Sequence, residues 1–171
     1  MKRGKVLVVD DNQGIRSALK ILLPVHFAEV EIIASPKRLV TTMESFHPDV
    51  VLLDMNFYTD INTGNEGLYW TGELKKMWPE VQIVLFTAYA DIALAVEGMK
   101  RGAFDFIVKP WDNDKLISTL KAAYAASPKG AKKSEMVTYF DMYWGDTPAM
   151  MRIKRTIEKI APTDATVLIT G

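Results

Sequence analysis

Four short apolar runs of the sequence end at residues whose side chains can do chemistry: Asp10 and Asp11, Asp54, Thr87 and Lys109. Carboxylates that lie close together repel one another, so a cluster of three would be stabilised by a cation. Oxygen ligands suit a hard ion such as Mg²⁺, which is commonly held by one or two carboxylates, water and phosphate oxygens. These side chains therefore predict a magnesium site to which a hydroxyl and an ammonium group also contribute.

Taken singly, each of these residues has an ordinary explanation. An aspartate after a strand is most often a turn former or a helix cap, and a lone lysine is usually solvated. The combination favours function, because turn chemistry rarely places complementary polar groups at the ends of four predicted strands out of five. His26 and His47 lack the spacing of metal ligands, so we expect no metal role for them.

The elements that position these residues are an alternation of apolar runs and amphipathic stretches. The apolar runs, interpreted as strands, are 6–9, 30–34, 50–53, 81–86 and 104–108. The amphipathic stretches, interpreted as helices, are 12–23, 35–46, 66–78, 91–100 and 112–126. This alternation favours an α/β fold with a doubly wound, five-stranded parallel sheet. Ligands of such sheets bind beyond the carboxyl ends of the strands, where the candidate residues lie.

The composition is that of an ordinary globular protein and narrows the function classes. The chain has 171 residues, of which 49% are hydrophobic and 25% charged, and its formal net charge is zero. Zero net charge argues against a general binder of nucleic acid or anionic membranes. The absence of cysteine excludes disulfides and thiolate metal sites. With neither a signal peptide nor an apolar run of about 18 residues, we expect a cytoplasmic protein.

Four motifs make the chain resemble the receiver domain of bacterial two-component response regulators. They are VLVVDDN (6–12), DVVLLDMN (49–56), VLFTAYAD (84–91) and GAFDFIVKPWD (102–112). The resemblance covers residues 1–126 and implies a flavodoxin-like sheet with strand order 2-1-3-4-5. It also implies that a sensor histidine kinase is a partner, and that Asp54 accepts its phosphoryl group.

The resemblance assigns roles to the other site residues. Asp11 and Asp54 would bind Mg²⁺ directly, Asp10 through water, and Asn56 through its backbone carbonyl. Lys109, which precedes a cis proline in this family, would neutralise phosphoryl charge, and Thr87 would donate its hydroxyl to a phosphoryl oxygen. Phe106 occupies the switch position, where the aromatic ring turns inward as Thr87 moves. The face of the fourth helix, fifth strand and fifth helix would then change shape, with a homodimer as one outcome.

The segment after Asp54 departs from the family pattern. The stretch MNFYTDINTGNEGL (55–68) is longer than usual and lacks the family's proline, and Glu66-Gly67 stands where Asp-Gly is expected. The longer loop could change the phosphoryl lifetime, the choice of kinase or docking. It could also be an inert insertion, because surface loops tolerate added length at small cost.

Residues after 126 have a different character. We expect a linker at 127–140, rich in basic and small residues, and an incomplete domain at 141–171. The latter resembles the start of the AAA+ ATPase domain of sigma-54-dependent transcription activators, and it ends at the first glycine of their phosphate-binding loop. We therefore expect a piece of a longer regulator that cannot itself bind ATP. Its missing domains would engage sigma-54 RNA polymerase and DNA.

Two other functions remain open. The first is a Mg²⁺-dependent phosphatase with Asp54 as nucleophile, although such enzymes normally carry an aspartate two residues after the nucleophile and position 56 is asparagine. The second is a binding module that no longer needs phosphorylation, which the retained candidate residues argue against. The favoured interpretation is a phosphoacceptor switch, catalytic only in assisting its own phosphorylation and dephosphorylation.

Overall fold

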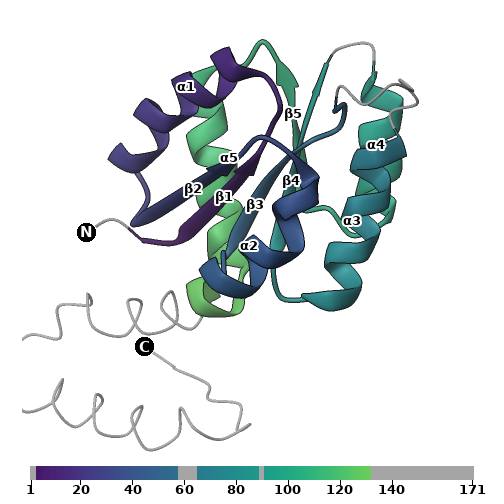
Figure 1. Cartoon of the computed structure of the whole chain (residues 1–171). Helices are drawn as coiled ribbons and strands as arrows, with labels where there is room; N and C mark the ends of the chain where they lie inside the picture. Colours follow the sequence, from purple (N-terminus) through teal and green to yellow (C-terminus); the bar gives the residue numbers. More distant parts are fainter. Residues whose placement is uncertain (1–2, 58–64, 89–90, 132–171) are drawn as a thin grey trace, which may run out of the picture. The chain divides into compact units, whose positions relative to one another are not determined.

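The computed structural model describes residues 3–57, 65–88 and 91–131, which form a five-stranded parallel sheet wrapped by helices (Figure 1). The strand order is β2-β1-β3-β4-β5. This order confirms the predicted doubly wound, flavodoxin-like architecture. The chain divides into the units 1–134 and 135–171, and the second unit lies outside the described residues.

The strands have the predicted positions with small differences at their ends. They are β1 (Lys5–Val9), β2 (Glu29–Ile33), β3 (Val50–Asp54), β4 (Gln82–Ala88) and β5 (Asp105–Lys109). Strand β4 continues past Thr87, because Ala88 still pairs with Lys109 of β5. Every residue of β3 is buried, whereas Glu29 and Glu31 of the edge strand β2 are exposed. Continuous apolar runs of this kind are expected for strands covered on both faces.

The helices and 3-10 turns are α1 (Gln13–Leu22), η1 (Leu23–Val25), η2 (Pro36–Arg38), α2 (Leu39–Phe46), α3 (Asn65–Met77), α4 (Ile92–Lys100) and α5 (Asn113–Ala126). Asn12 caps α1 by accepting a hydrogen bond from the Ile15 N–H, as its residue type predicts. The helix expected from Pro36 begins instead with the 3-10 turn η2, capped by the Ser35 side chain. A 3-10 turn is common at the end of an α-helix, so this difference does not change the layer arrangement.

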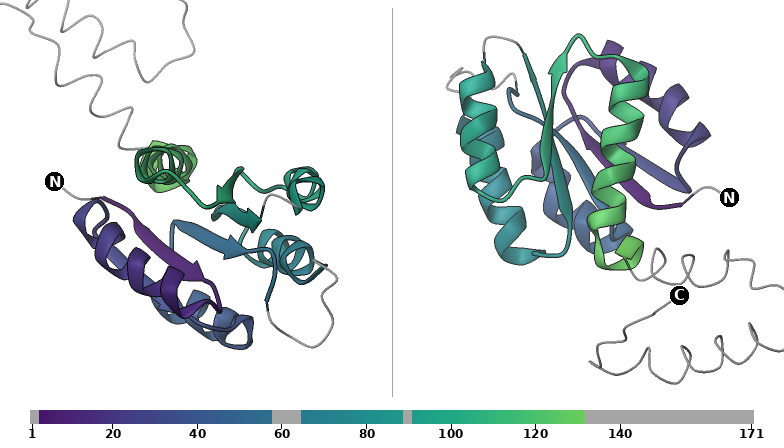
Figure 2. Two further views of the ribbon diagram at one scale, coloured as in Figure 1. Left: turned by 90° about the horizontal axis from the view of Figure 1, so that it is seen from above. Right: turned by 180° about the vertical axis from the view of Figure 1, so that it is seen from behind.

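Two apolar cores lie on opposite faces of the sheet. Residues of α1 and α5 pack on one face, with Leu19 and Leu120 fully buried there. Residues of α2, α3 and α4 pack on the other, including Leu39, Leu74 and Ala95. Figure 2 shows α5 in front of the sheet in the view from behind. The covered faces leave the carboxyl edge of the sheet as the place where polar side chains gather.

The chain turns back on the sheet directly after α5. The Ser127 hydroxyl donates to the Tyr124 carbonyl, and residues 128–131 are helical. The Lys129 ammonium lies 3.0 Å from the carboxylate of Asp49, a buried residue just before β3. The chain therefore stays attached to the amino edge of the sheet as far as residue 131.

In the part of the chain that the structure describes, no helix has the length and apolarity needed to cross a membrane.

Candidate functional site

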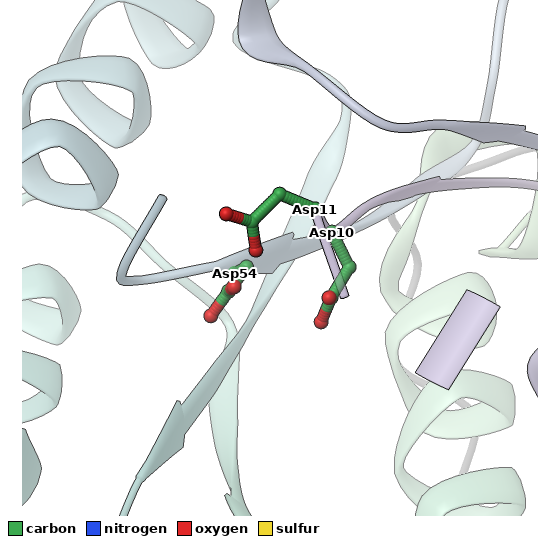
Figure 3. Close-up of side chains that lie close together, drawn as sticks. All are labelled: Asp10, Asp11 and Asp54. Carbon is green, nitrogen blue, oxygen red and sulfur yellow. The ribbon is translucent and has the colours of Figure 1, made fainter. Parts of the chain in front are cut away.

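The carboxyl edge of the sheet brings together the acidic residues singled out in the sequence. Asp10 and Asp11 directly follow β1, and Asp54 is the last residue of β3. One carboxylate oxygen from each of these three residues lies within 4.8 Å of the others. Figure 3 shows the three side chains gathered between the ends of the two strands. The predicted cluster is therefore present in the folded chain.

Strand geometry explains why this cluster includes Lys109. Successive side chains of a strand point to opposite faces of the sheet. Asp10, Asp54 and Lys109 each stand two positions after a core residue on the face covered by α1 and α5; these core residues are Val8, Leu52 and Ile107. The three polar side chains therefore continue one face of the sheet beyond the point where the apolar core ends.

Lys109 links two of the carboxylates. Its ammonium nitrogen lies 2.8 Å from a carboxylate oxygen of Asp10 and 2.9 Å from one of Asp54. The same nitrogen lies 4.6 Å from the centre of the Phe86 ring, so the ring supports it from one side. The Lys109-Pro110 peptide bond is cis, as the resemblance implied.

The Asp54 carboxyl is held in an environment that disfavours its charge. The pKa of Asp54 is raised from 3.8 to about 6, mainly by burial and to a smaller extent by the neighbouring Asp10 carboxylate, against the opposing attraction of Lys109. Hydrogen bonds from Lys109 and from the Asn56 N–H, the latter 3.3 Å long, also lower this pKa. Since burial dominates, the single ammonium does not balance the cluster, and the site favours a further cation.

The donor set of the cluster suits Mg²⁺. Three carboxylates offer hard oxygen ligands, and two of them, Asp10 and Asp54, are almost completely buried. One oxygen of Asp10 accepts the Asn12 N–H at 2.8 Å and the other accepts Lys109, which fits a role for Asp10 outside direct metal contact. The residues present therefore fit the ion that the sequence predicted.

Thr87 and Phe106 lie on the opposite face from Lys109. Thr87 is fully buried and its hydroxyl donates to the carbonyl of Ala88 at 3.3 Å, so the structure places it near the site without joining it to Asp54. Phe106 is half-buried and packs against the core beneath α2, α3 and α4. The insertion expected after Asp54 falls largely at 58–64, outside the described residues.

Sequence reasoning missed two polar contacts beside the cluster. The Asn56 side-chain amide donates to the carboxylate of Asp91, which precedes α4. The Arg16 guanidinium, from α1, donates to the backbone carbonyls of Asp10 and Asp11. The only sequence signal for Arg16 is its place one helical turn after Asn12, and that place is equally suitable for a solvated arginine.

Comparison with known proteins agrees with this geometry. Residues 6–121, well over half of the chain, match the family described as the response regulator receiver domain. The chain belongs to this family. A receiver-domain crystal structure from Bacteroides fragilis, described as the N-terminal signal receiver domain of a two-component system response regulator, is 50% identical with a TM-score of 0.66. It covers 72% of this chain and 98% of its own.

Longer relatives are transcription regulators. The transcriptional regulatory protein ZraR of Salmonella typhimurium is 34% identical over 175 residues, and the match covers 100% of this chain and 38% of ZraR. The DNA-binding transcriptional regulator NtrC of the same organism is 29% identical, with 36% of its length covered. The crystal structure of NtrX from Brucella abortus has a TM-score of 0.68 at 29% identity, covering 94% of this chain and 35% of NtrX. The chain thus spans little more than a third of these relatives' length.

Proposed function

We propose that this receiver domain is a phosphoacceptor switch in which Asp54 takes a phosphoryl group from a sensor histidine kinase. The observation that carries the proposal is the placement of Asp54 between two acidic neighbours and the ammonium of Lys109. Phosphoryl transfer depends mainly on positioning and on neutralisation of charge, and this arrangement supplies both.

The proposed transfer uses the side chains as follows. A carboxylate oxygen of Asp54 attacks the phosphorus of a phosphohistidine, the phosphorus–nitrogen bond breaks, and the imidazole nitrogen leaves with the bonding electrons. Asp11, Asp54 and the Asn56 carbonyl would hold Mg²⁺ directly and Asp10 would hold it through water; the ion would neutralise charge on the carboxylates and the phosphoryl oxygens. Lys109 would exchange its contact with Asp54 for a phosphoryl oxygen. This exchange is supported by its position 2.9 Å from Asp54.

The proposed output signal passes through Thr87 and Phe106, the two side chains on the face of the sheet opposite Lys109. The Thr87 hydroxyl would turn from the Ala88 carbonyl toward a phosphoryl oxygen, and Phe106 would move inward into the space left beside it. The surface of α4, β5 and α5 would then change and either form a homodimer or release a partner. The likeness to ZraR and NtrC supports the proposal that this change controls an attached transcription regulator.

The same likeness extends the proposal to the whole protein. We propose a receiver domain at 1–126, a linker at 127–140 and the start of an AAA+ domain at 141–171. In the complete regulator, which we place in the cytoplasm, the further domains would act on sigma-54 RNA polymerase and DNA. The phosphatase alternative is not supported, because the Asn56 amide, which donates to Asp91, has no acidic proton to give a leaving group.

Intact-mass measurement after incubation with acetyl phosphate tests the proposal. We expect the protein to gain one phosphoryl group only when Mg²⁺ is present, and the Asp54→Asn variant to gain none. The exposed Asp114 gives a matched control, since Asp114→Asn should be labelled like the unchanged protein. Labelling that persists in Asp54→Asn, or no labelling while Mg²⁺ is bound, would contradict the proposal.

A further inference from the structure

Arg16 makes an unusual pair of contacts at the loop that carries two of the three carboxylates. One terminal nitrogen of its guanidinium donates to the carbonyl of Asp10 at 2.9 Å and to the carbonyl of Asp11 at 2.6 Å. Arg16 is itself fixed in the first turn of α1, where its N–H donates to the Asn12 carbonyl at 3.0 Å. The side chain thus joins the helix to the loop that precedes it.

This contact addresses a geometric problem of the acidic cluster. Consecutive side chains of an extended strand point to opposite faces, so Asp10 and Asp11 cannot both face Asp54 if β1 simply continues. The backbone has to leave the strand conformation between the Asp10 N–H, which still donates to the Ile33 carbonyl of β2, and Asn12, which caps α1. Arg16 binds the two carbonyls that lie within this change of direction.

We infer that Arg16 is a positioning residue that sets the affinity of the site for Mg²⁺. By holding the carbonyls of Asp10 and Asp11, it keeps their two carboxylates directed at the same point as that of Asp54. The guanidinium acts through these aspartates and does not itself touch the ion. This inference rests on the proposed function, because it concerns the same Mg²⁺ site.

The direction in which Arg16→Ala changes the affinity for Mg²⁺ distinguishes a positioning role from a purely electrostatic one. Arg16 carries a positive charge beside an acidic cluster, so its charge alone weakens the binding of a cation. If charge were its only influence, Arg16→Ala would bind Mg²⁺ more tightly than the unchanged protein. If Arg16 positions the ligands, the same substitution weakens binding, as loss of a residue that orients metal ligands typically does by roughly 10- to 100-fold.

The test is a Mg²⁺ titration of the ¹⁵N-labelled protein, followed by the amide resonances of residues 10–12 and 54–56. We expect Arg16→Ala to raise the dissociation constant by roughly tenfold or more. Arg16→Lys, which keeps the charge and one flexible donor group, should recover part of the affinity. Lys20→Ala is the matched control, since it removes one positive charge from an exposed position one turn further along α1.

The outcomes distinguish this inference from the proposed function. Weaker binding by Arg16→Ala, partial recovery by Arg16→Lys and no weakening by Lys20→Ala would support it. Unchanged or tighter binding by Arg16→Ala would refute it and leave the phosphoacceptor proposal intact. If Arg16→Ala does not fold, the Mg²⁺ affinity of Arg16→Lys is compared with that of the unchanged protein instead. Equal affinities would refute the inference. Failure of the unchanged protein to bind Mg²⁺ would refute both.

Discussion

We expect the ionised Asp54 carboxylate to lower the free energy of unfolding of the metal-free protein at neutral pH. Its pKa is about 6 in the folded chain and 3.8 when unperturbed. Between these values the folded state binds more protons than the unfolded state, so the free energy of unfolding falls as the pH rises through this window. The Asp54→Asn substitution replaces the carboxylate by a neutral group of the same shape and removes this dependence.

The size of the effect follows from the pKa change. A rise from 3.8 to about 6 corresponds to roughly 3 kcal/mol, at about 1.4 kcal/mol for each pKa unit. Only 6% of the Asp54 side chain is exposed, so solvent screening removes little of this amount. We therefore expect Asp54→Asn to be more stable than the unchanged protein by about 2–3 kcal/mol at pH 7.5. The difference should be close to zero at pH 4.

Urea denaturation in the presence of EDTA, at several pH values from 4 to 7.5, measures this difference. Glu44→Gln provides a control in which an exposed carboxylate becomes an amide, and its effect should be small throughout. Saturating Mg²⁺ should reduce the advantage of Asp54→Asn, because the ion stabilises the charged form. A stability difference that does not change with pH, or a less stable Asp54→Asn at pH 7.5, would show that burial of the charge is not what disfavours it.

Three further predictions concern the ammonium group, the metal and the helical residues that follow α5. Lys109→Met should abolish labelling by acetyl phosphate yet tighten Mg²⁺ binding, measured by titration, because the competing ammonium is gone; weaker binding would contradict this. Lowering the pH from 7.5 to 5.5 should weaken Mg²⁺ binding about fourfold as protons occupy Asp54, whose pKa is about 6, and an unchanged affinity would show that Asp54 does not contact the ion. Gly130→Ala should destabilise the protein by about 1–3 kcal/mol in urea, because the new methyl group would overlap the backbone of Tyr124. Gly72→Ala, a control in an open position of α3, should instead stabilise it by about 0.5–1 kcal/mol, so equal effects of the two would refute the packing argument.

The sheet and the acidic cluster were predictable because they depend on local patterns. An uninterrupted apolar run such as 50–53 identifies a buried strand, and the position of Asp54 directly after it fixes the edge at which its carboxylate lies. The parallel order of the strands then brings the ends of β1, β3 and β5 together. Only the strand order and the detailed roles required the family resemblance.

The contacts of Arg16 and Asn56 were not predictable in the same way. Each joins a side chain to a group whose direction depends on a loop, and the sequence contains no periodicity for loops. The ion pair between Lys129 and Asp49 was not predicted either, because the two residues are distant in the sequence and a basic linker residue is usually solvated. The 3-10 turn at Pro36 was a smaller miss, because proline suits the first turn of either helix type.

The attachment of residues 127–131 determines where any module that follows is anchored. Asp49 lies before β3 and Asp54 ends it, and a strand of this length spans about 16 Å. Residues 127–131 therefore lie at the edge of the sheet opposite the acidic cluster, and they belong to the folded unit. A fusion of another domain at residue 127 would break the Ser127 hydrogen bonds and the ion pair between Lys129 and Asp49. A junction at 132 would keep both, so equal-length linkers inserted at these two points would not give equivalent proteins.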